Sequence, residues 1–391
     1  MTQTHIVIIG AGYAGMMAAL RLTKQPDAQV TLVNASPVFV ERIRLHEVAA
    51  GSSKAFHALA PLLAGTGIRF VQGRVTQLDP AHKTLAIDTQ AGNPMRYDKL
   101  VYALGSRVNS DSVPGVREHA YSLDPATAQR LHEALRLLPT GARVVVCGGG
   151  LTGIEGATEI AEAYPQLRVQ LVTRDGFGER LSAQGQAYLR QAFARFAITV
   201  SEGVNVEAVD AGALLTTQGT IPFDLCLWAG SFVAHGLARE GGLAVNASGQ
   251  IVVDDYLRSI SHSDIYAAGD AAWVEGHPSP IRMGCVTAMP MGAQVAANLR
   301  VLLRGQGQQP FRFGYPGQCI SLGRHDALVQ LTGRDDSMRE QIITGRAAAG
   351  VKEFICRFTW GTLQIERRLP GVYRYLSSAE PVVNREPSHV R

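Results

Sequence analysis

The strongest constraint on the fold is a strand–glycine–helix–strand pattern at the start of the chain. Residues 5–9 (HIVII) form an apolar run, and Gly10, Gly12 and Gly15 follow it at GxGxxG spacing. An apolar helical pattern (MMAALRL) comes next, and then a second strand pattern, QVTLV, which ends at Asn34. A β-branched run of this kind is typical of a buried parallel strand. The opening residues therefore predict a Rossmann-like strand–helix–strand unit.

Each glycine of the motif has its own physical role. The first allows a tight turn, the second lets the backbone approach a pyrophosphate, and the third lets the helix pack closely on the strand. The helix N-terminus then offers free N–H groups and the positive end of its dipole to phosphates. The motif predicts a dinucleotide site formed by Gly10, Ala11, Gly12, Tyr13, Ala14 and Gly15.

The same pattern returns at residues 143–173. An apolar strand (ARVVVC) precedes glycines at the same spacing, a helix follows, and the strand RVQLVT ends at Thr173. A second copy in the correct context predicts a second dinucleotide. The residues expected to form its site are Gly148, Gly149, Gly150, Leu151, Thr152 and Gly153.

Composition excludes several other classes of protein. A chain of 391 residues is longer than one hydrophobic core usually serves, and its net charge of +4 includes no dense Lys/Arg block that predicts nucleic-acid binding. The five cysteines have no CxxC or metal-like spacing, which predicts no metal site and suits a reducing, cytoplasmic compartment. No window of 18 apolar residues predicts a transmembrane segment.

The pattern of three later segments predicts buried strands, each of which ends in a glycine turn. They are YDKLVYALGS (97–106), FDLCLWAG (223–230) and DIYAAGDAAW (264–273). A helix is expected from about 288 to 303, and the pattern after 311 favours short strands followed by a polar, proline-bearing tail.

The order of these motifs resembles that of the flavoprotein reductases with two dinucleotide-binding domains. GAGYAG, YALGS, GGGLTGIE and YAAGDAAW carry the resemblance, which covers essentially the full length. Within that superfamily the chain is most similar to the type II NADH dehydrogenase and apoptosis-inducing-factor-like quinone reductase group. The supporting segments are LHEVAAG, GRVTQLDP and FGYPGQCISLGRHDALVQL.

This resemblance implies an α/β fold of two Rossmann-like, three-layer domains, the second inserted in the first, and a small C-terminal α+β region. The FAD-binding domain is expected at 1–115 and 250–318, and the NAD(P)H-binding domain at 120–249. Residues 319–391 are expected to form an interface or acceptor region.

By the same resemblance the first unit would hold FAD. Asp270 would accept hydrogen bonds from its ribityl or pyrophosphate part, although an Asp there can also act as an N-cap. Arg42, with Arg44, would stabilise negative charge on the reduced flavin or on an acceptor, although an exposed arginine is often only solvated. The other residues expected on the FAD side are Asn34, Val75, Ala103, Leu104, Gly105, Gly269, Ala288 and Met289.

The second unit would hold the nicotinamide cofactor. Glu155 matches a family glutamate near the nicotinamide, the alternative being an acid that complements the helix dipole. Ala229 and Gly230 would border the cofactor. An acid usually ends the second strand and binds the ribose 2′-OH, whereas this chain has Thr173 and Arg174, which favours NADPH; Asp175, slightly later, can restore NAD preference.

The expected reaction is hydride transfer from NAD(P)H to the flavin and electron transfer to a small acceptor, with the protein supplying geometry and electrostatics. A quinone acceptor is a hypothesis, because Val286 and Pro290 stand where the family's glutamine pair falls. Amphipathic C-terminal membrane helices are not evident, since prolines break residues 366–391. Peripheral membrane contact and the oligomeric state stay open.

Four other functions stand as alternatives, and the cysteine positions argue against two of them. A disulfide reductase needs paired cysteines after the first unit, and residues 35–60 contain none. A sulfide:quinone reductase would have only Cys285, Cys319 and Cys356 to use, because Cys147 lies in a strand. A flavin-dependent tailoring oxidoreductase or monooxygenase, and a slow-turnover flavin-binding signalling protein, stay as alternatives.

Overall fold

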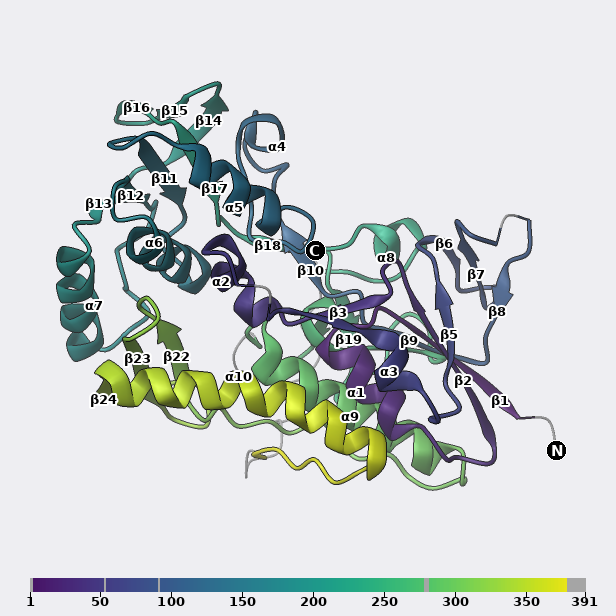
Figure 1. Cartoon of the computed structure of the whole chain (residues 1–391). Helices are drawn as coiled ribbons and strands as arrows, with labels where there is room; N and C mark the ends of the chain where they lie inside the picture. The colour runs from purple at the N-terminus through teal and green to yellow at the C-terminus, as the bar shows by residue number, and fades with distance from the viewer. Residues whose placement is uncertain (1–2, 53, 91, 278–280, 378–391) are drawn as a thin grey trace.

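The computed structural model describes residues 3–52, 54–90, 92–277 and 281–377, which build two parallel sheets (Figure 1). The first has the order β20-β9-β1-β2-β5 and the second the order β13-β12-β11-β17. All pairings inside these two sheets are parallel. Their strands are β1 (Thr4–Ile9), β2 (Ala28–Asn34), β5 (Arg69–Gln72), β9 (Lys99–Tyr102), β20 (Ile265–Ala267), β11 (Arg143–Cys147), β12 (Arg168–Val172), β13 (Thr199–Ser201) and β17 (Leu225–Trp228).

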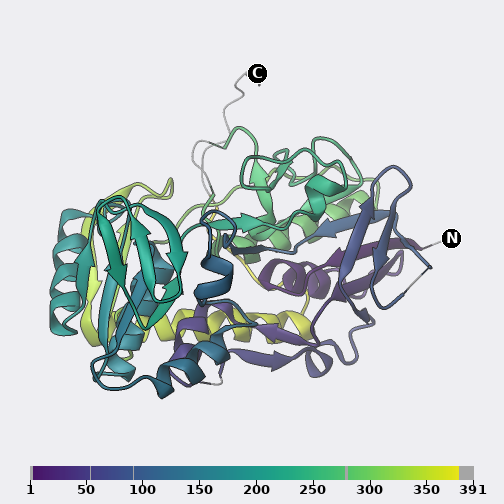
Figure 2. The same ribbon diagram turned by 90° about the horizontal axis from the view of Figure 1, so that it is seen from above.

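The chain order confirms the expected insertion. The whole second sheet falls between β9 and β20, so the chain leaves the first unit, completes the second and returns. Figure 2 shows the two units as separate lobes. The antiparallel pair β10 (Ser106–Val108) and β18 (Phe232–Ala234) connects the two crossings between them.

Smaller antiparallel sheets accompany each parallel sheet. One three-stranded sheet lies in each unit, and a short two-stranded pair lies in the first. Their strands are β6 (Val75–Asp79), β7 (Thr84–Ile87), β8 (Met95–Arg96), β14 (Val206–Asp210), β15 (Ala213–Thr216), β16 (Gly219–Pro222), β3 (Val38–Val40) and β4 (Phe56–Ala58). A further short pair, β19 (Ile251–Val253) and β21 (Ala272–Val274), is parallel.

Helices pack against the two parallel sheets and connect their strands. They are α1 (Tyr13–Arg21), α2 (Leu45–Ala49), α3 (Leu59–Leu63), α4 (Val116–His119), α5 (Ala128–Leu137), α6 (Leu151–Ala163), α7 (Ala183–Arg195), α8 (Leu237–Glu240), α9 (Cys285–Leu302) and α10 (Gly345–Arg368). Two 3-10 turns, η1 (Arg42–Arg44) and η2 (Gly269–Ala271), complete the set. The helix expected from 288 begins at residue 285 and includes Pro290.

Strand β11 explains why the second unit has three layers. Successive strand residues point to opposite faces of a sheet. Val144 and Val146 belong to the core that includes residues of α5, α6 and α7, whereas Val145 and Cys147 belong to the core shared with β14 and β15. The parallel sheet is therefore buried on both faces, as its continuous apolar sequence requires.

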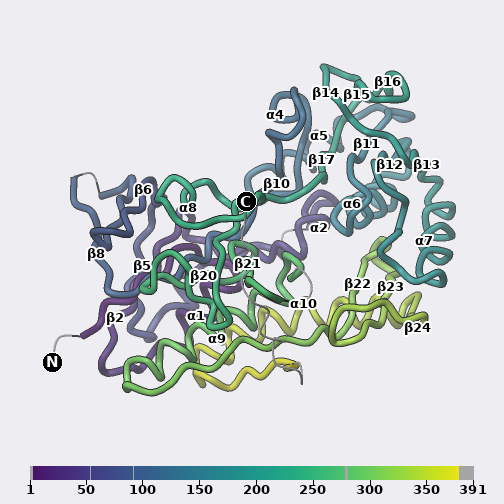
Figure 3. Tube along the Cα trace, turned by 180° about the vertical axis from the view of Figure 1, so that it is seen from behind, coloured from purple at the N-terminus to yellow at the C-terminus, as the bar shows by residue number. Residues whose placement is uncertain are grey.

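In the first unit, α1 and α9 lie side by side against the parallel sheet (Figure 3). Their backbones approach so closely that a Cβ on Gly292 of α9 would lie 2.2 Å from the carbonyl oxygen of Ala14 in α1. Glycine at this position therefore sets the distance between the two helices.

The C-terminal region holds a helix that the sequence analysis missed. An antiparallel sheet of β22 (Gln318–Ser321), β23 (Ala327–Thr332) and β24 (Met338–Thr344) precedes the 24-residue helix α10. Figure 1 shows α10 along the base of the molecule, where it contacts the C-terminal sheet at one end and α1 at the other. Among the described residues, no helix is long and apolar enough to cross a membrane.

The buried stripe of α10 explains why periodicity did not reveal it. Ala348, Lys352, Cys356, Thr359 and Leu363 recur at helical spacing and are buried. Two of these side chains are polar and a third is a thiol, so the apolar period is weak. Glycines at 345, 350 and 361 lower the helix propensity further.

A pair of glycine substitutions tests the helix packing. We expect Gly292→Ala to lower the free energy of unfolding by about 2 kcal/mol or more, because the new methyl group meets backbone. Gly350→Ala on α10 meets nothing within 4 Å and should raise it by up to about 1 kcal/mol through helix propensity. Urea unfolding of both variants measures the difference, and equal effects would contradict the close approach of α1 and α9.

Candidate functional site

The first glycine turn combines close packing with one open position. Gly10 has φ +98°, and a Cβ on it would lie 2.3 Å from the carbonyl oxygen of Ala103. A Cβ on Gly15 would lie 1.9 Å from the carbonyl oxygen of Gly10. By contrast, a Cβ on Gly12 would meet nothing within 4 Å, and no side chain caps the N-terminus of α1. The turn therefore presents uncapped amide groups to open space, which fits a pyrophosphate.

The second glycine turn repeats this geometry. Gly148 has φ +121°, and a Cβ on it would lie 2.8 Å from the carbonyl oxygen of Ala229. A Cβ on Gly153 would lie 1.9 Å from the carbonyl oxygen of Gly148. Gly150 is open like Gly12, and α6 likewise has no side-chain cap. Both turns thus offer the same kind of anion site.

Polar groups predicted on the FAD side lie beside the first turn. The side-chain oxygen of Asn34 accepts a hydrogen bond from the amide of Ala11 at 3.0 Å. Arg42 donates to the carbonyl oxygen of Ser106 at 2.6 Å, and the Ser106 hydroxyl donates to Asp270 at 2.7 Å. Ser106 was not identified from the sequence, because a serine after a glycine turn has no distinctive signal.

Small residues bring three elements together at this point. A Cβ on Gly269, which has φ +71°, would lie 3.1 Å from Cβ of Ala14 and 3.4 Å from Cβ of Ala288. Gly105 also lies here, with the guanidinium of Arg42 3.9 Å from its Cβ position. The structure therefore groups residues from α1, η2, α9 and the loop after β9 that the sequence predicted as one site.

The remaining predicted residues lie in different surroundings: in a separate sheet, in the core, or at the second glycine turn and the surface beside it. Val75 begins β6 in an antiparallel sheet, not in the five-stranded parallel sheet that carries Gly10. Met289 is 1% exposed in the core of the first unit. Thr173 lies against Gly149, whose Cβ would be 2.5 Å from the Thr173 hydroxyl oxygen, whereas Arg174 is exposed and pairs with Asp175 at 3.1 Å.

Glu155 is the centre of a buried polar cluster. Its Oε1 accepts hydrogen bonds from Nζ of Lys352 at 2.7 Å and from the amide of Ser321 at 2.9 Å. Its Oε2 lies 3.7 Å from Nδ1 of His46. The fifth residue of α6, Glu155 lies beyond the first turn, and the helix has no acid in that turn, so the role of dipole partner does not apply.

The charges in this cluster follow from burial and proximity. Burial raises the pKa of Glu155, but the charge and hydrogen bond of Lys352, with the hydrogen bond from the Ser321 amide, outweigh this effect and hold it below its ordinary value. Burial lowers the pKa of Lys352, and Glu155 more than reverses that shift. Burial also lowers the pKa of His46 to about 4, so its imidazole is neutral at pH 7, and its Nε2 is buried without a hydrogen-bond partner.

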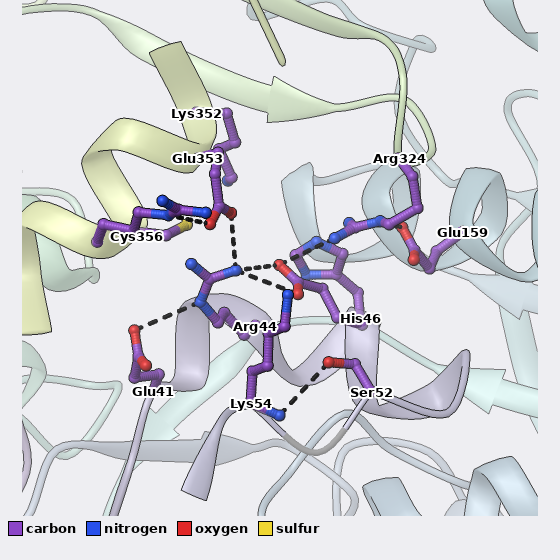
Figure 4. Close-up of polar contacts among 12 residues, drawn as sticks. Glu41, Arg44, His46, Ser52, Lys54, Glu159, Arg324, Lys352, Glu353 and Cys356 are labelled. Atoms are coloured by element: carbon purple, nitrogen blue, oxygen red, sulfur yellow. Dashed lines mark hydrogen bonds and ion pairs between the residues drawn. The ribbon is translucent and has the colours of Figure 1, made fainter. Parts of the chain in front are cut away.

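Arg44 stands at the centre of a second group of charges (Figure 4). Its guanidinium lies 3.5 Å from Glu41, 2.9 Å from Glu47 and 3.0 Å from Glu353 of α10. Three carboxylates therefore surround one cation. The expectation that Arg44 shares the role of Arg42 is unsupported, because the charge of Arg44 is already balanced.

The cysteine thiols near α10 stay protonated. Burial raises the pKa of Cys285 to about 11 and that of Cys356 to about 12, and it raises the pKa of Cys319 as well. All five cysteines of the chain are free thiols. Because the thiolate is the reactive form, this arrangement disfavours disulfide or sulfide chemistry.

Sequence reasoning missed Lys352 and Glu353 for one reason. Both lie on α10. Lys352 is 197 positions from its partner Glu155, and Glu353 is 309 positions from its partner Arg44. Lysine and glutamate are mostly exposed residues, so a Lys–Glu pair in a segment without a recognised helix predicts a solvated surface. No local signal in the sequence marks them as partners of Glu155 and Arg44.

Known proteins resemble this chain over most of its length. Residues 4–298 match the model of the pyridine nucleotide-disulphide oxidoreductase family. An NADH dehydrogenase-like protein of Mycobacterium tuberculosis is 30% identical, covering 76% of this chain and 80% of its own. A type II NADH:quinone oxidoreductase of Staphylococcus aureus is 27% identical, covering 90% and 94%.

Solved structures support the same fold. The sulfide:quinone oxidoreductase of Aquifex aeolicus superposes with a TM-score of 0.81 at 20% identity, covering 94% of this chain and 93% of its own. NDH2 of Plasmodium falciparum, in complex with NADH, gives 0.78 at 15% identity, covering 94% and 99%. The resemblance drawn from the motifs is confirmed: this chain belongs to the pyridine nucleotide-disulphide oxidoreductase family.

Proposed function

We propose that this chain, an NAD(P)H-dependent oxidoreductase like its relatives, binds FAD at its first glycine turn and passes electrons from NAD(P)H to a small, quinone-like acceptor. One observation carries the proposal: two turns of the same geometry each leave a helix N-terminus uncapped and open. A single dinucleotide would leave one of them without a role.

The residues of the first turn fit FAD. The amides at Gly12 and the start of α1 would bind the pyrophosphate, and Asn34 and Asp270 would accept hydrogen bonds from hydroxyl groups. Arg42, held on Ser106, would place positive charge beside the ring system. When bound, FAD accepts a hydride from the nicotinamide and delivers electrons to the acceptor.

The second turn and its neighbours would hold NAD(P)H. Gly150 and the start of α6 would bind the pyrophosphate, and Ala229 and Gly230 would border the nicotinamide half. The preference for NADPH rests on Thr173 and Arg174, where an acid more often stands. Asp175 opposes that preference, because it pairs with the Arg174 guanidinium.

Glu155 and Lys352 would manage protons rather than electrons. Reduction of a quinone-like acceptor consumes protons as well as electrons. Lys352 and the Ser321 amide occupy Oε1, so a proton would be accepted and passed on at Oε2, which faces the neutral imidazole of His46. Lys352 is then a positioning residue, because it acts through Glu155.

The acceptor has its strongest support in the outer face of α10. Phe354, Phe358 and Ile365 on this helix, and Leu369 directly after it, are between 48% and 65% exposed. An exposed apolar stripe on an amphipathic helix favours contact with a membrane surface, where a lipid-soluble quinone would be reached. We therefore propose peripheral membrane contact, from the cytoplasmic side, which suits a chain whose cysteines are free thiols.

Two matched substitutions test the assignment of the two turns. Gly12→Asp and Gly150→Asp each add a carboxylate where nothing lies within 4 Å, so both variants should fold. We expect Gly12→Asp to be colourless, because its charge repels the pyrophosphate of FAD. Gly150→Asp should stay yellow but lose reduction by NAD(P)H in stopped-flow experiments. Wild-type protein that stays colourless after incubation with FAD would overturn the proposal.

A variant series tests the proton role of Glu155. Lys352→Met leaves a buried carboxylate unpaired, so its pKa should rise and kcat should fall about tenfold or more at pH 7, with a lesser effect on the KM for NAD(P)H. Loss of folding stability would accompany this change. The double variant Glu155→Gln/Lys352→Met removes both charges, so it should recover stability but not turnover. Wild-type kcat in the double variant would contradict the role.

Cofactor preference depends on the Arg174–Asp175 pair. Asp175→Ala frees the guanidinium of Arg174, so the ratio of kcat/KM for NADPH over NADH should rise by about tenfold, equivalent to ~1.4 kcal/mol. Arg174→Ala should lower the same ratio. Steady-state kinetics with both nucleotides measures it, and an unchanged ratio in both variants would show that specificity lies elsewhere.

An acceptor panel separates the remaining functions. Rapid reoxidation by quinones supports the proposal, whereas rapid reaction with oxygen and an organic substrate favours a tailoring oxidoreductase or monooxygenase. Slow turnover with every acceptor favours a flavin-binding signalling protein.

A further inference from the structure

A polar cavity lies outside the proposed redox site. It has a volume of about 570 Å³ and opens between α1, α9 and residues 373–377. The side chains that define its chemistry are Arg21, Gln294, Arg312, Tyr373, Arg374 and Tyr375. Arg21 ends α1, whereas Gly12 precedes the start of the same helix, so the cavity and the first glycine turn lie at opposite ends of α1.

Arginine charge in this cavity is only partly balanced. Arg21 is 7% exposed, and its Nε lies 3.9 Å from Glu366. Both oxygens of Glu366 are already engaged, because they accept the amides of Gly371 and Tyr373 at 2.6 Å. Glu366 therefore offers the cavity little free capacity for hydrogen bonds.

Other arginines lie close to Arg21. Burial lowers the pKa of Arg21, Glu366 raises it, and the nearby charges of Arg374 and Arg300 lower it again. Arg312 lines the cavity and interacts with Asp255. Among the described residues that line the cavity, three are arginines (Arg21, Arg312 and Arg374) and none is a carboxylate. An anion in the cavity would relieve this repulsion and accept bonds from the guanidinium groups.

The surroundings of the cavity are apolar. Val372 and Leu376 are 51% and 49% exposed, and they flank Arg374 at a spacing of two residues on each side. On α10, Phe354, Phe358 and Ile365 are separated by four and seven residues, which places them on one face of the helix, and the exposed Leu369 directly follows its last residue. Tyr373, which lines the cavity, has its ring 6.4 Å from that of Phe358, so the arginines lie near apolar side chains suited to the boundary of a lipid layer.

We propose that this cavity binds the phosphate of an anionic phospholipid headgroup while the neighbouring apolar side chains enter the acyl boundary. The inference rests on the peripheral membrane contact proposed above and adds a lipid class to it. A soluble phosphate would satisfy the arginines equally well, but it would leave Val372, Leu376 and the stripe on α10 in water. The lipid phosphate uses both features at once.

Vesicle co-sedimentation of the full-length, flavin-loaded protein tests this site. Vesicles of phosphatidylcholine alone are compared with vesicles containing phosphatidylglycerol. We expect the wild type to bind the anionic vesicles about tenfold more tightly. Arg312→Gln/Arg374→Gln should lose this preference but keep the weaker binding to neutral vesicles. The control Arg69→Gln/Arg96→Gln removes the same charge from exposed positions of β5 and β8 and should behave as the wild type.

Each other outcome has a distinct meaning. Wild-type protein that binds neither kind of vesicle overturns the proposed membrane contact, and Phe354→Ser/Phe358→Ser should reproduce that behaviour. A preference for anionic vesicles that survives in Arg312→Gln/Arg374→Gln overturns the cavity assignment alone. If inorganic phosphate raises the Tm of the wild type but not of that variant, and vesicle charge has no effect, the cavity takes a soluble phosphate and the lipid assignment is wrong. Turnover with a soluble quinone confirms that the variants are folded.

Discussion

The structure depends on backbone contact at two glycine turns. In each turn the third glycine lies so near the carbonyl oxygen of the first that a Cβ would come within 1.9 Å of it. That contact fixes where α1 and α6 begin relative to β1 and β11, and it directs both helix N-termini outward from the strand ends. The second glycine of each turn stays open, so packing and binding use different residues of the same motif. A family this diverse in sequence can therefore keep one geometry.

What the sequence could predict is local. A glycine motif after a β-branched run such as residues 6–9 can be recognised within one short segment, and both parallel units were identified from such signals. The insertion was implied by the family resemblance and not by local signals, although the strand predicted at 264–273 does form β20 beside β9. The glycine turns and their flanking strands have their physical cause within about thirty residues of chain.

The part that could not be predicted is long-range. Lys352 reaches Glu155 across 197 positions, and Glu353 reaches Arg44 across 309. Neither partner is abnormal in its own segment, so only the folded chain reveals that the buried Glu155, Lys352 and Arg44 and the partly exposed Glu353 are brought together. Such pairs rarely add stability, since desolvation offsets their attraction. Their position between α2, α6 and α10 is easier to explain by chemistry at Glu155 than by folding.

Helix α10 connects these observations. Its inner face carries Lys352 into the cluster at Glu155, and its outer face carries the exposed stripe that begins at Phe354. Lys352 and Phe354, two positions apart in the sequence, therefore belong to the proposed proton chemistry and to the proposed lipid contact. Because α10 carries polar side chains such as Lys352 on its buried face, that face is not purely apolar. This is the physical reason that its sequence does not resemble that of an ordinary core helix. The polar residues on the buried face of α10 made the helix hard to predict from the sequence, and the same helix connects the buried charges to the molecular surface.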